Sequence, residues 1–113
     1  MKHLEEDIQI CCVEWFKLQY PNIIIHHSPN GGKRNAREAA RFRKMGTCPG
    51  FPDIFIAKAN NKYYGLFIEM KAESNRLTQS QTIIIDKLMR ENYYCAVCYS
   101  VESFMKTVNR YFE

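Results

Sequence analysis

The chain has 113 residues, of which 46% are hydrophobic and 25% charged, and its formal net charge is +4. This length predicts one domain over residues 1–113, with enough apolar material for a core and a mild preference for polyanionic partners. No membrane association is expected, because no stretch approaches the roughly 20 apolar residues of a membrane span. No secretory signal is expected either, because the acidic residues 5–7 stand where an apolar run would be needed.

The cysteines indicate a reducing compartment. Without a secretory context, we expect reduced thiols in a cytoplasmic protein. Cys95 and Cys98 have a metal-like spacing, but a straight strand would put their thiols on opposite faces. With no second pair at ligand spacing, a structural zinc site is not expected.

The first predicted element is an amphipathic helix over residues 4 to 19, which Pro21 ends. At about 100° per residue, Glu5 lies at the edge of its apolar stripe, whereas Glu6 points well away from it. The stripe predicted to be buried consists of Leu4, Ile8, Cys11, Cys12, Trp15 and Leu18.

A short buried strand is predicted next, over residues 23 to 27, because it is rich in isoleucine. Its two histidines point to opposite faces, so at most one reaches the sheet surface that holds the acids described below. A histidine in a strand is more often packed than catalytic, and His27 is retained as an auxiliary candidate. The turn that follows contains Asn30 and Gly31, which either let the backbone approach DNA closely or serve only as a turn.

Residues 33 to 45 predict a second helix that is strongly basic and lightly packed. Four of its basic side chains recur at three- and four-residue steps and form a cationic ridge, namely Arg34, Arg37, Arg41 and Lys44. Together with Lys33, this ridge would neutralise DNA phosphates. The alternative is a solvated helix face.

The second half of the chain predicts an antiparallel hairpin from about Ile54 to Lys71, followed by a helix that Thr78 opens. The buried face of that helix is predicted to hold Ile84, Ile85, Leu88 and Met89. A strand over residues 93 to 99 and a last helix capped by Ser100 complete the chain. The resulting fold class is α/β, with a central mixed sheet of about four strands flanked by helices on both faces.

Three charged residues stand beside or within the apolar runs of this hairpin. Asp53 precedes the first strand, and Glu69 and Lys71 interrupt the second. Since successive side chains alternate in a strand, Glu69 and Lys71 share one face. Burial of an unpaired carboxylate is costly, so a positive group is expected beside these acids. If the strand after Asp53 pairs with this one, the three charges could meet at one end of the sheet.

Two carboxylates beside a lysine suit phosphodiester chemistry that depends on a divalent metal. Mg²⁺ and Mn²⁺ prefer carboxylate and water ligands, and an ammonium group offsets charge in the transition state. On pattern alone, an exposed Glu-Lys pair on an edge strand is an equally reasonable reading.

A wider set of motifs resembles one nuclease family. Pro52-Asp53, then residues 54 to 68, then Glu69-Met70-Lys71 resemble the PD-(D/E)xK nuclease motif. The surrounding segments HSPNGGKR (27–34), PGFPDI (49–54), GLFIEMK (65–71) and LTQSQ (77–81) make nearly the whole chain similar to the VRR-NUC (virus-type replication-repair nuclease) domain. The length resembles stand-alone bacteriophage forms, and the implied core is restriction-endonuclease-like.

The resemblance implies roles for the hairpin residues. Asp53 and Glu69 would be metal ligands, with the main-chain carbonyl of Met70 as a third, and Lys71 would be the catalytic lysine. The metal would be Mg²⁺ or Mn²⁺.

The resemblance also implies roles outside the hairpin. Gln81 would help to position the site or the phosphate, although it also fits a capping box with Thr78. The family uses a first-helix glutamate ahead of a glutamine, and Glu5, four residues before Gln9, fits as a catalytic residue and metal ligand. Glu6 is the competing choice.

The leading functional hypothesis is a metal-dependent DNA endonuclease that is selective for branched DNA, such as four-way (Holliday) junctions or flaps, in DNA repair or recombination. Stand-alone members of the family are expected to be homodimers. One rival hypothesis is a non-catalytic DNA-binding module with the same fold. Another is an unrelated basic interaction domain in which the acids are surface residues.

Overall fold

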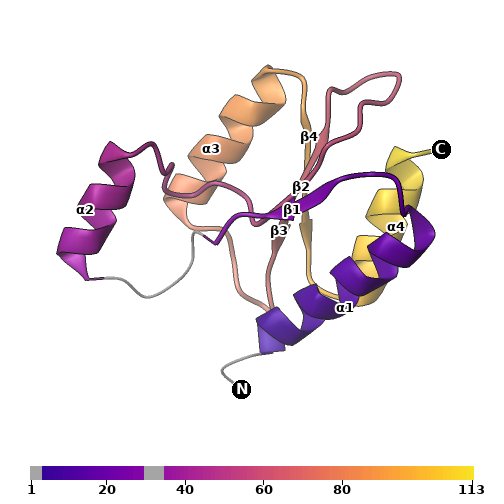
Figure 1. Cartoon of the computed structure of the whole chain (residues 1–113), viewed down its shortest axis with the longest axis horizontal. Coiled ribbons are helices and arrows are strands. Elements are labelled where there is room, and N and C mark those ends of the chain that lie inside the picture. The colour runs from indigo at the N-terminus through magenta and orange to yellow at the C-terminus, as the bar shows by residue number, and fades with distance from the viewer. Residues whose placement is uncertain (1–3, 30–34) are drawn as a thin grey trace.

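The computed structural model describes residues 4–29 and 35–113 and shows an α/β fold in which helices cover both faces of one sheet (Figure 1). The sheet has four strands in the order β1-β2-β3-β4. Strands β1, β2 and β3 pair antiparallel, whereas β4 is parallel to β3. The predicted mixed sheet with helices on both faces is therefore confirmed.

The predicted hairpin is confirmed as well. Strand β2 (Ile54–Ile56) pairs antiparallel with β3 (Leu66–Met70), and Ile54 lies opposite Ile68. Strand β4 (Tyr94–Cys98) follows on the other side of β3, so β3 is an interior strand, and all five of its residues are buried.

One face of the sheet forms the main hydrophobic core with helices α1 (Leu4–Gln19) and α4 (Val101–Tyr111). The fully buried side chains there include Cys12, Phe16, Ile54, Ile56, Leu66, Ile68, Met70, Cys98, Phe104 and Val108. The predicted α1 stripe was partly wrong, because Cys11 is exposed and Leu18 is 81% exposed. The packed face is centred on Cys12 and Phe16, and at about 100° per residue Leu18 lies well away from that line.

The other face of the sheet carries aromatic rings and helix α3 (Gln79–Arg90). Phe55 stacks on Phe67, with 4.4 Å between ring centroids, and Tyr93 meets both rings edge-on. Thr78 caps α3 as predicted, and Ser100 caps α4. The predicted burial of Met89 was wrong, because this one helix covers its face without a second layer and Met89 is about half exposed.

Two elements are shorter or more exposed than the sequence indicated. Strand β1 covers only Ile25–His27, and both of its histidines are exposed, because β1 is an edge strand paired with β2 alone. Helix α2 covers Ala36–Lys44 and is capped by the side chain of Asn35. It has no buried residue and projects from the body of the molecule (Figure 1).

Candidate active site

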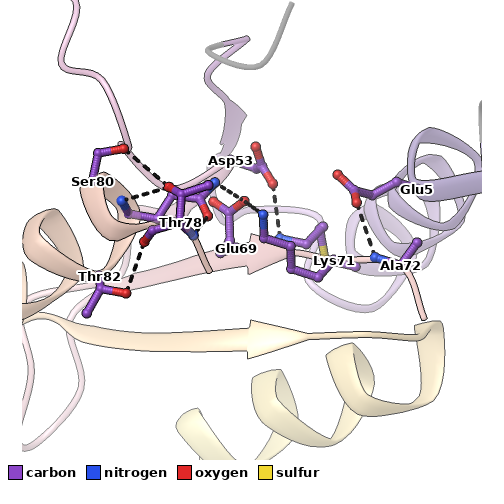
Figure 2. Close-up of polar contacts among 10 residues, drawn as sticks. Glu5, Asp53, Glu69, Lys71, Ala72, Thr78, Ser80 and Thr82 are labelled. Carbon is purple, nitrogen blue, oxygen red and sulfur yellow. Dashed lines mark hydrogen bonds and ion pairs between the residues drawn. The ribbon is translucent and has the colours of Figure 1, made fainter. Parts of the chain in front are cut away.

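The hairpin register brings Asp53 and Glu69 level with each other. Ile54 pairs with Ile68, and one further step along the antiparallel pair places Asp53 opposite Glu69. Opposed residues of antiparallel strands point to the same face, which here is also the face of Phe55 and Phe67. The two carboxylates therefore meet at one end of the sheet, as Figure 2 shows.

Glu69 is a buried carboxylate with an incomplete set of partners. It is 3% exposed and lies on β3, an interior strand of the sheet. Its Oε2 accepts a hydrogen bond from Gln81 Nε2 at 3.0 Å and lies 3.8 Å from Lys71 Nζ. Its Oε1 is buried and has no hydrogen-bond partner among the described residues. The reading of Glu69 and Lys71 as a surface pair on an edge strand is therefore wrong.

The electrostatics of Glu69 reflect this burial. Desolvation is the main cause that raises the pKa of Glu69 from 4.5 to about 8, and the charge of Asp53 adds to the effect. The positive charge of Lys71 lowers the pKa of Glu69 but does not offset the increase caused by burial and Asp53. Without a further positive charge, the two acids thus resist being ionised together near neutral pH.

Asp53 is held from both neighbouring strands. Its Oδ2 accepts a hydrogen bond from the Met70 backbone N–H at 3.0 Å (Figure 2). On the other side, its main-chain carbonyl accepts from the Ser28 backbone N–H at 2.8 Å and lies 3.1 Å from His27 Nδ1. Backbone and carboxylate are therefore fixed separately, one by β1 and the other by β3.

Gln81 joins the end of α3 to the acid pair. Its Oε1 accepts a hydrogen bond from the Thr78 backbone N–H at 2.9 Å, which completes the capping box. The amide nitrogen is thereby turned toward Glu69, to which it donates. The capping box is therefore confirmed, and the same amide also contacts Glu69 because the two hydrogen bonds use different atoms. The role of Gln81 in positioning the site or the phosphate stays a prediction.

A glycine sets how closely α3 approaches this end of the sheet. Gly50 adopts φ +86°, and a Cβ built on it would lie 2.5 Å from the carbonyl oxygen of Ser80. Only glycine tolerates both the left-handed conformation and this approach. The loop before Asp53 thus packs directly on the first turn of α3, one residue away from Gln81.

The sequence model of the VRR-NUC domain matches residues 4–102. The chain belongs to the VRR-NUC domain family. A solved structure described as a VRR-NUC domain protein is similar over 95% of this chain and 86% of that chain, with 31% identity and a TM-score of 0.79. A comparison with curated proteins gives no match. As a VRR-NUC domain, the chain is a nuclease-type domain that processes DNA.

Glu5, one of the two candidate first-helix acids of this VRR-NUC domain, lies beside the end of β3. Glu5 Oε2 accepts a hydrogen bond from the Ala72 backbone N–H at 3.1 Å (Figure 2). Glu6 is exposed. Within residues 4–29 and 35–113, no three His, Cys, Asp or Glu side chains are grouped closely enough to hold one metal ion. The role of Glu5 as a metal ligand stays a prediction.

The predicted DNA-binding residues are only partly visible. Arg37, Arg41 and Lys44 are exposed on α2. Asn30, Gly31, Lys33 and Arg34 lie outside the described residues. No helix in the described part of the chain is long and apolar enough to cross a membrane.

Two contacts near the site were missed at the level of sequence. The register places His26 on the face that holds the acids, whereas His27 lies on the face of α1. His27 nevertheless contacts the Asp53 carbonyl and also lies 3.0 Å from Gln9 Nε2. The available signal was the spacing of Glu5 and Gln9, which puts both residues on one side of α1.

Proposed function

We propose that this VRR-NUC domain is a divalent-metal-dependent endonuclease that hydrolyses phosphodiester bonds in DNA. The observation that carries the proposal is the buried Glu69 Oε1, which has no hydrogen-bond partner among the described residues and stands beside Asp53. Buried polar atoms are almost always paired in native proteins. A cation bound between the carboxylates would provide that partner and offset both the desolvation and the repulsion by Asp53 that raise the pKa of Glu69.

The donor set fits Mg²⁺ or Mn²⁺. Both ions prefer oxygen ligands and retain several waters, so two carboxylates and a main-chain carbonyl are sufficient. Asp53 and Glu69 would supply the carboxylates and Met70 the carbonyl, with Glu5 as a further candidate. Such a cation polarises a phosphate oxygen and lowers the pKa of a bound water.

The remaining side chains would hold charge and geometry around the scissile phosphate. Lys71 lies close to Glu69 and would offset the negative charge that develops in the transition state. Gln81 fixes the orientation of the Glu69 carboxylate and is itself fixed by the helix cap. These contacts link the catalytic strand to α3 and keep the acid in one rotamer.

Binding to DNA would rest mainly on phosphate contacts, which carry little sequence information. The projecting helix α2, with Arg37, Arg41 and Lys44 exposed, supports this mode of binding. Selectivity for branched DNA and assembly as a homodimer follow from the resemblance to stand-alone VRR-NUC proteins. The projection of α2 would allow contact with DNA beyond the cleavage site.

The deciding experiment measures cleavage of four-way junctions, flaps and linear duplexes with Mg²⁺, Mn²⁺ or EDTA. We expect metal-dependent cutting that is lost in Asp53→Asn and in Lys71→Ala, while both variants still bind DNA. Asp53→Asn keeps an oxygen for the Met70 N–H, so it removes charge with little change in shape. An exposed lysine provides the matched control in Lys62→Ala.

Two results would contradict the proposal. Cutting that survives Asp53→Asn would place the chemistry elsewhere. DNA binding without metal-dependent cutting of any substrate would favour the non-catalytic DNA-binding module instead.

A further inference from the structure

The Asp53 carbonyl is the point at which β1 contacts the site. It accepts a hydrogen bond from the Ser28 backbone N–H at 2.8 Å and lies 3.1 Å from His27 Nδ1. The peptide bond fixes this carbonyl relative to the Cα that carries the carboxylate. A group that holds the carbonyl therefore also constrains the direction in which the Asp53 side chain leaves the backbone.

The chemistry of these atoms assigns the proton on the His27 ring. A carbonyl oxygen can only accept, so a hydrogen bond to Asp53 requires that Nδ1 carries the proton. The side-chain amide of Gln9 lies 3.0 Å from the same Nδ1. The near atom of that amide is assigned as Nε2, and an amide N–H facing a ring N–H would repel it. The hydrogen bond to Asp53 therefore calls for the opposite orientation of the Gln9 amide, with its oxygen toward the ring. Amide orientation is assigned from such networks, since oxygen and nitrogen are nearly isosteric.

Helix α1 connects this contact with the far side of the site. Glu5 and Gln9 are four residues apart, so they lie one above the other on the same face of α1. Glu5 binds the Ala72 N–H just after β3, and Gln9 reaches His27 at the end of β1. One face of α1 therefore contacts the ends of β1 and β3, and Asp53 immediately precedes β2, which lies between these two strands.

We infer that His27, supported by Gln9, is a positioning residue that holds Asp53 in the geometry required for catalysis. This inference rests on the proposed function. His27 contacts the main chain of Asp53 and lies on the opposite face of the sheet from Glu69. Its exposure makes it suitable for substitution, because an exposed side chain contributes little to packing.

The test measures the single-turnover cleavage rate at saturating protein, using whichever DNA the wild type cuts. A misplacement of about 1 Å can reduce a rate by about 100-fold, so we expect His27→Ala to be slower by about ten- to hundredfold. The dissociation constant for DNA should change by less than about twofold. His27→Asn should recover most of the rate, because its amide nitrogen falls near Nδ1, whereas His27→Gln should not.

A double-mutant cycle tests the support from Gln9. If Gln9 acts through His27, Gln9→Ala combined with His27→Ala should be no slower than His27→Ala alone. The exposed Gln19→Ala, on the same helix, is the matched control and should cut at the wild-type rate.

The possible failures are distinguishable. A wild type that never cuts DNA would defeat the proposed function itself. A wild type that cuts, together with a His27→Ala variant that cuts equally fast, would overturn only the positioning role. That role would also be overturned if the loss appeared solely in DNA affinity, or if His27→Gln recovered the rate as well as His27→Asn.

Discussion

Substitution of Glu69→Gln should flatten the pH dependence of the free energy of unfolding of the metal-free protein. In the folded chain, burial and the charge of Asp53 raise the pKa of Glu69 to about 8 from its ordinary value of 4.5. In the unfolded chain, the same carboxyl is solvated and returns to its ordinary pKa. The two states therefore bind different numbers of protons between these pH values.

The sign follows from the proton counts. Between pH 4.5 and about 8, the folded state keeps the proton that the unfolded state has released, so stability falls as pH rises. The contribution of Glu69 is fully present below pH 4.5 and is lost as pH rises through about 8. At about 1.36 kcal/mol per pH unit, this interval corresponds to at most about 5 kcal/mol. That amount is a large part of the stability of a small domain.

Urea denaturation in EDTA between pH 4.5 and 8.5 measures the effect. The difference in unfolding free energy between wild type and Glu69→Gln should change by several kcal/mol over this range, because other titrating groups are common to both proteins. The exposed Glu14→Gln is the matched control, and its curve should run parallel to the wild type. Parallel curves for Glu69→Gln would refute the reasoning.

Three further predictions concern the surroundings of the site. Gly50→Ala should lower the free energy of unfolding by about 1–3 kcal/mol in urea denaturation, because the added Cβ meets backbone 2.5 Å away. Arg37→Ala with Arg41→Ala should reduce the slope of log affinity against log salt by up to about 2 in a DNA titration, at about 0.9 per lost phosphate contact. Thr78→Ala should lower the free energy of unfolding by about 1 kcal/mol and leave the cleavage rate unchanged. Gln81→Ala should lower the free energy of unfolding and, in addition, slow cleavage, because it removes the hydrogen bond to Glu69.

Matched variants isolate each cause. Gly46 also has a positive φ, +111°, but its Cβ would meet nothing within 4 Å, so Gly46→Ala reports backbone strain without the clash. Equal losses at Gly46 and Gly50 would contradict the packing argument. Lys106→Ala, on α4, should leave the salt slope unchanged. If Thr78→Ala and Gln81→Ala slowed cleavage equally, Gln81 would act only through the helix cap.

Local chemistry made much of the fold predictable. The apolar runs on both sides of residues 57–65 identified the β2–β3 hairpin, and alternation put Glu69 and Lys71 on one face. The capping box of Thr78 and Gln81 needs only four residues, so it was visible in the sequence. The sequence predicted that Asp53 meets Glu69 and Lys71 if the two strands pair, and the observed register brings Asp53 level with Glu69.

Features that depend on neighbours were not predictable. An isoleucine run suggested that residues 23–27 are buried, but burial depends on the position of β1 at the sheet edge. Leu18 fits an apolar stripe, yet the partner helix α4 meets α1 along Cys12 and Phe16. The contact of His27 with Asp53 joins residues 26 positions apart, and no local pattern encodes it.

The distances around Glu69 argue against a purely structural charge pair. A pair kept for stability would bring Lys71 to hydrogen-bond distance, whereas its Nζ stands 3.8 Å from the carboxylate. Asp53 and Glu69 together carry two negative charges when ionised, against one on Lys71. Such an arrangement lowers stability at neutral pH, so another role must account for it. Binding of a divalent cation would favour ionisation of both acids, and the folded state would gain stability from the same residues that we propose for DNA cleavage.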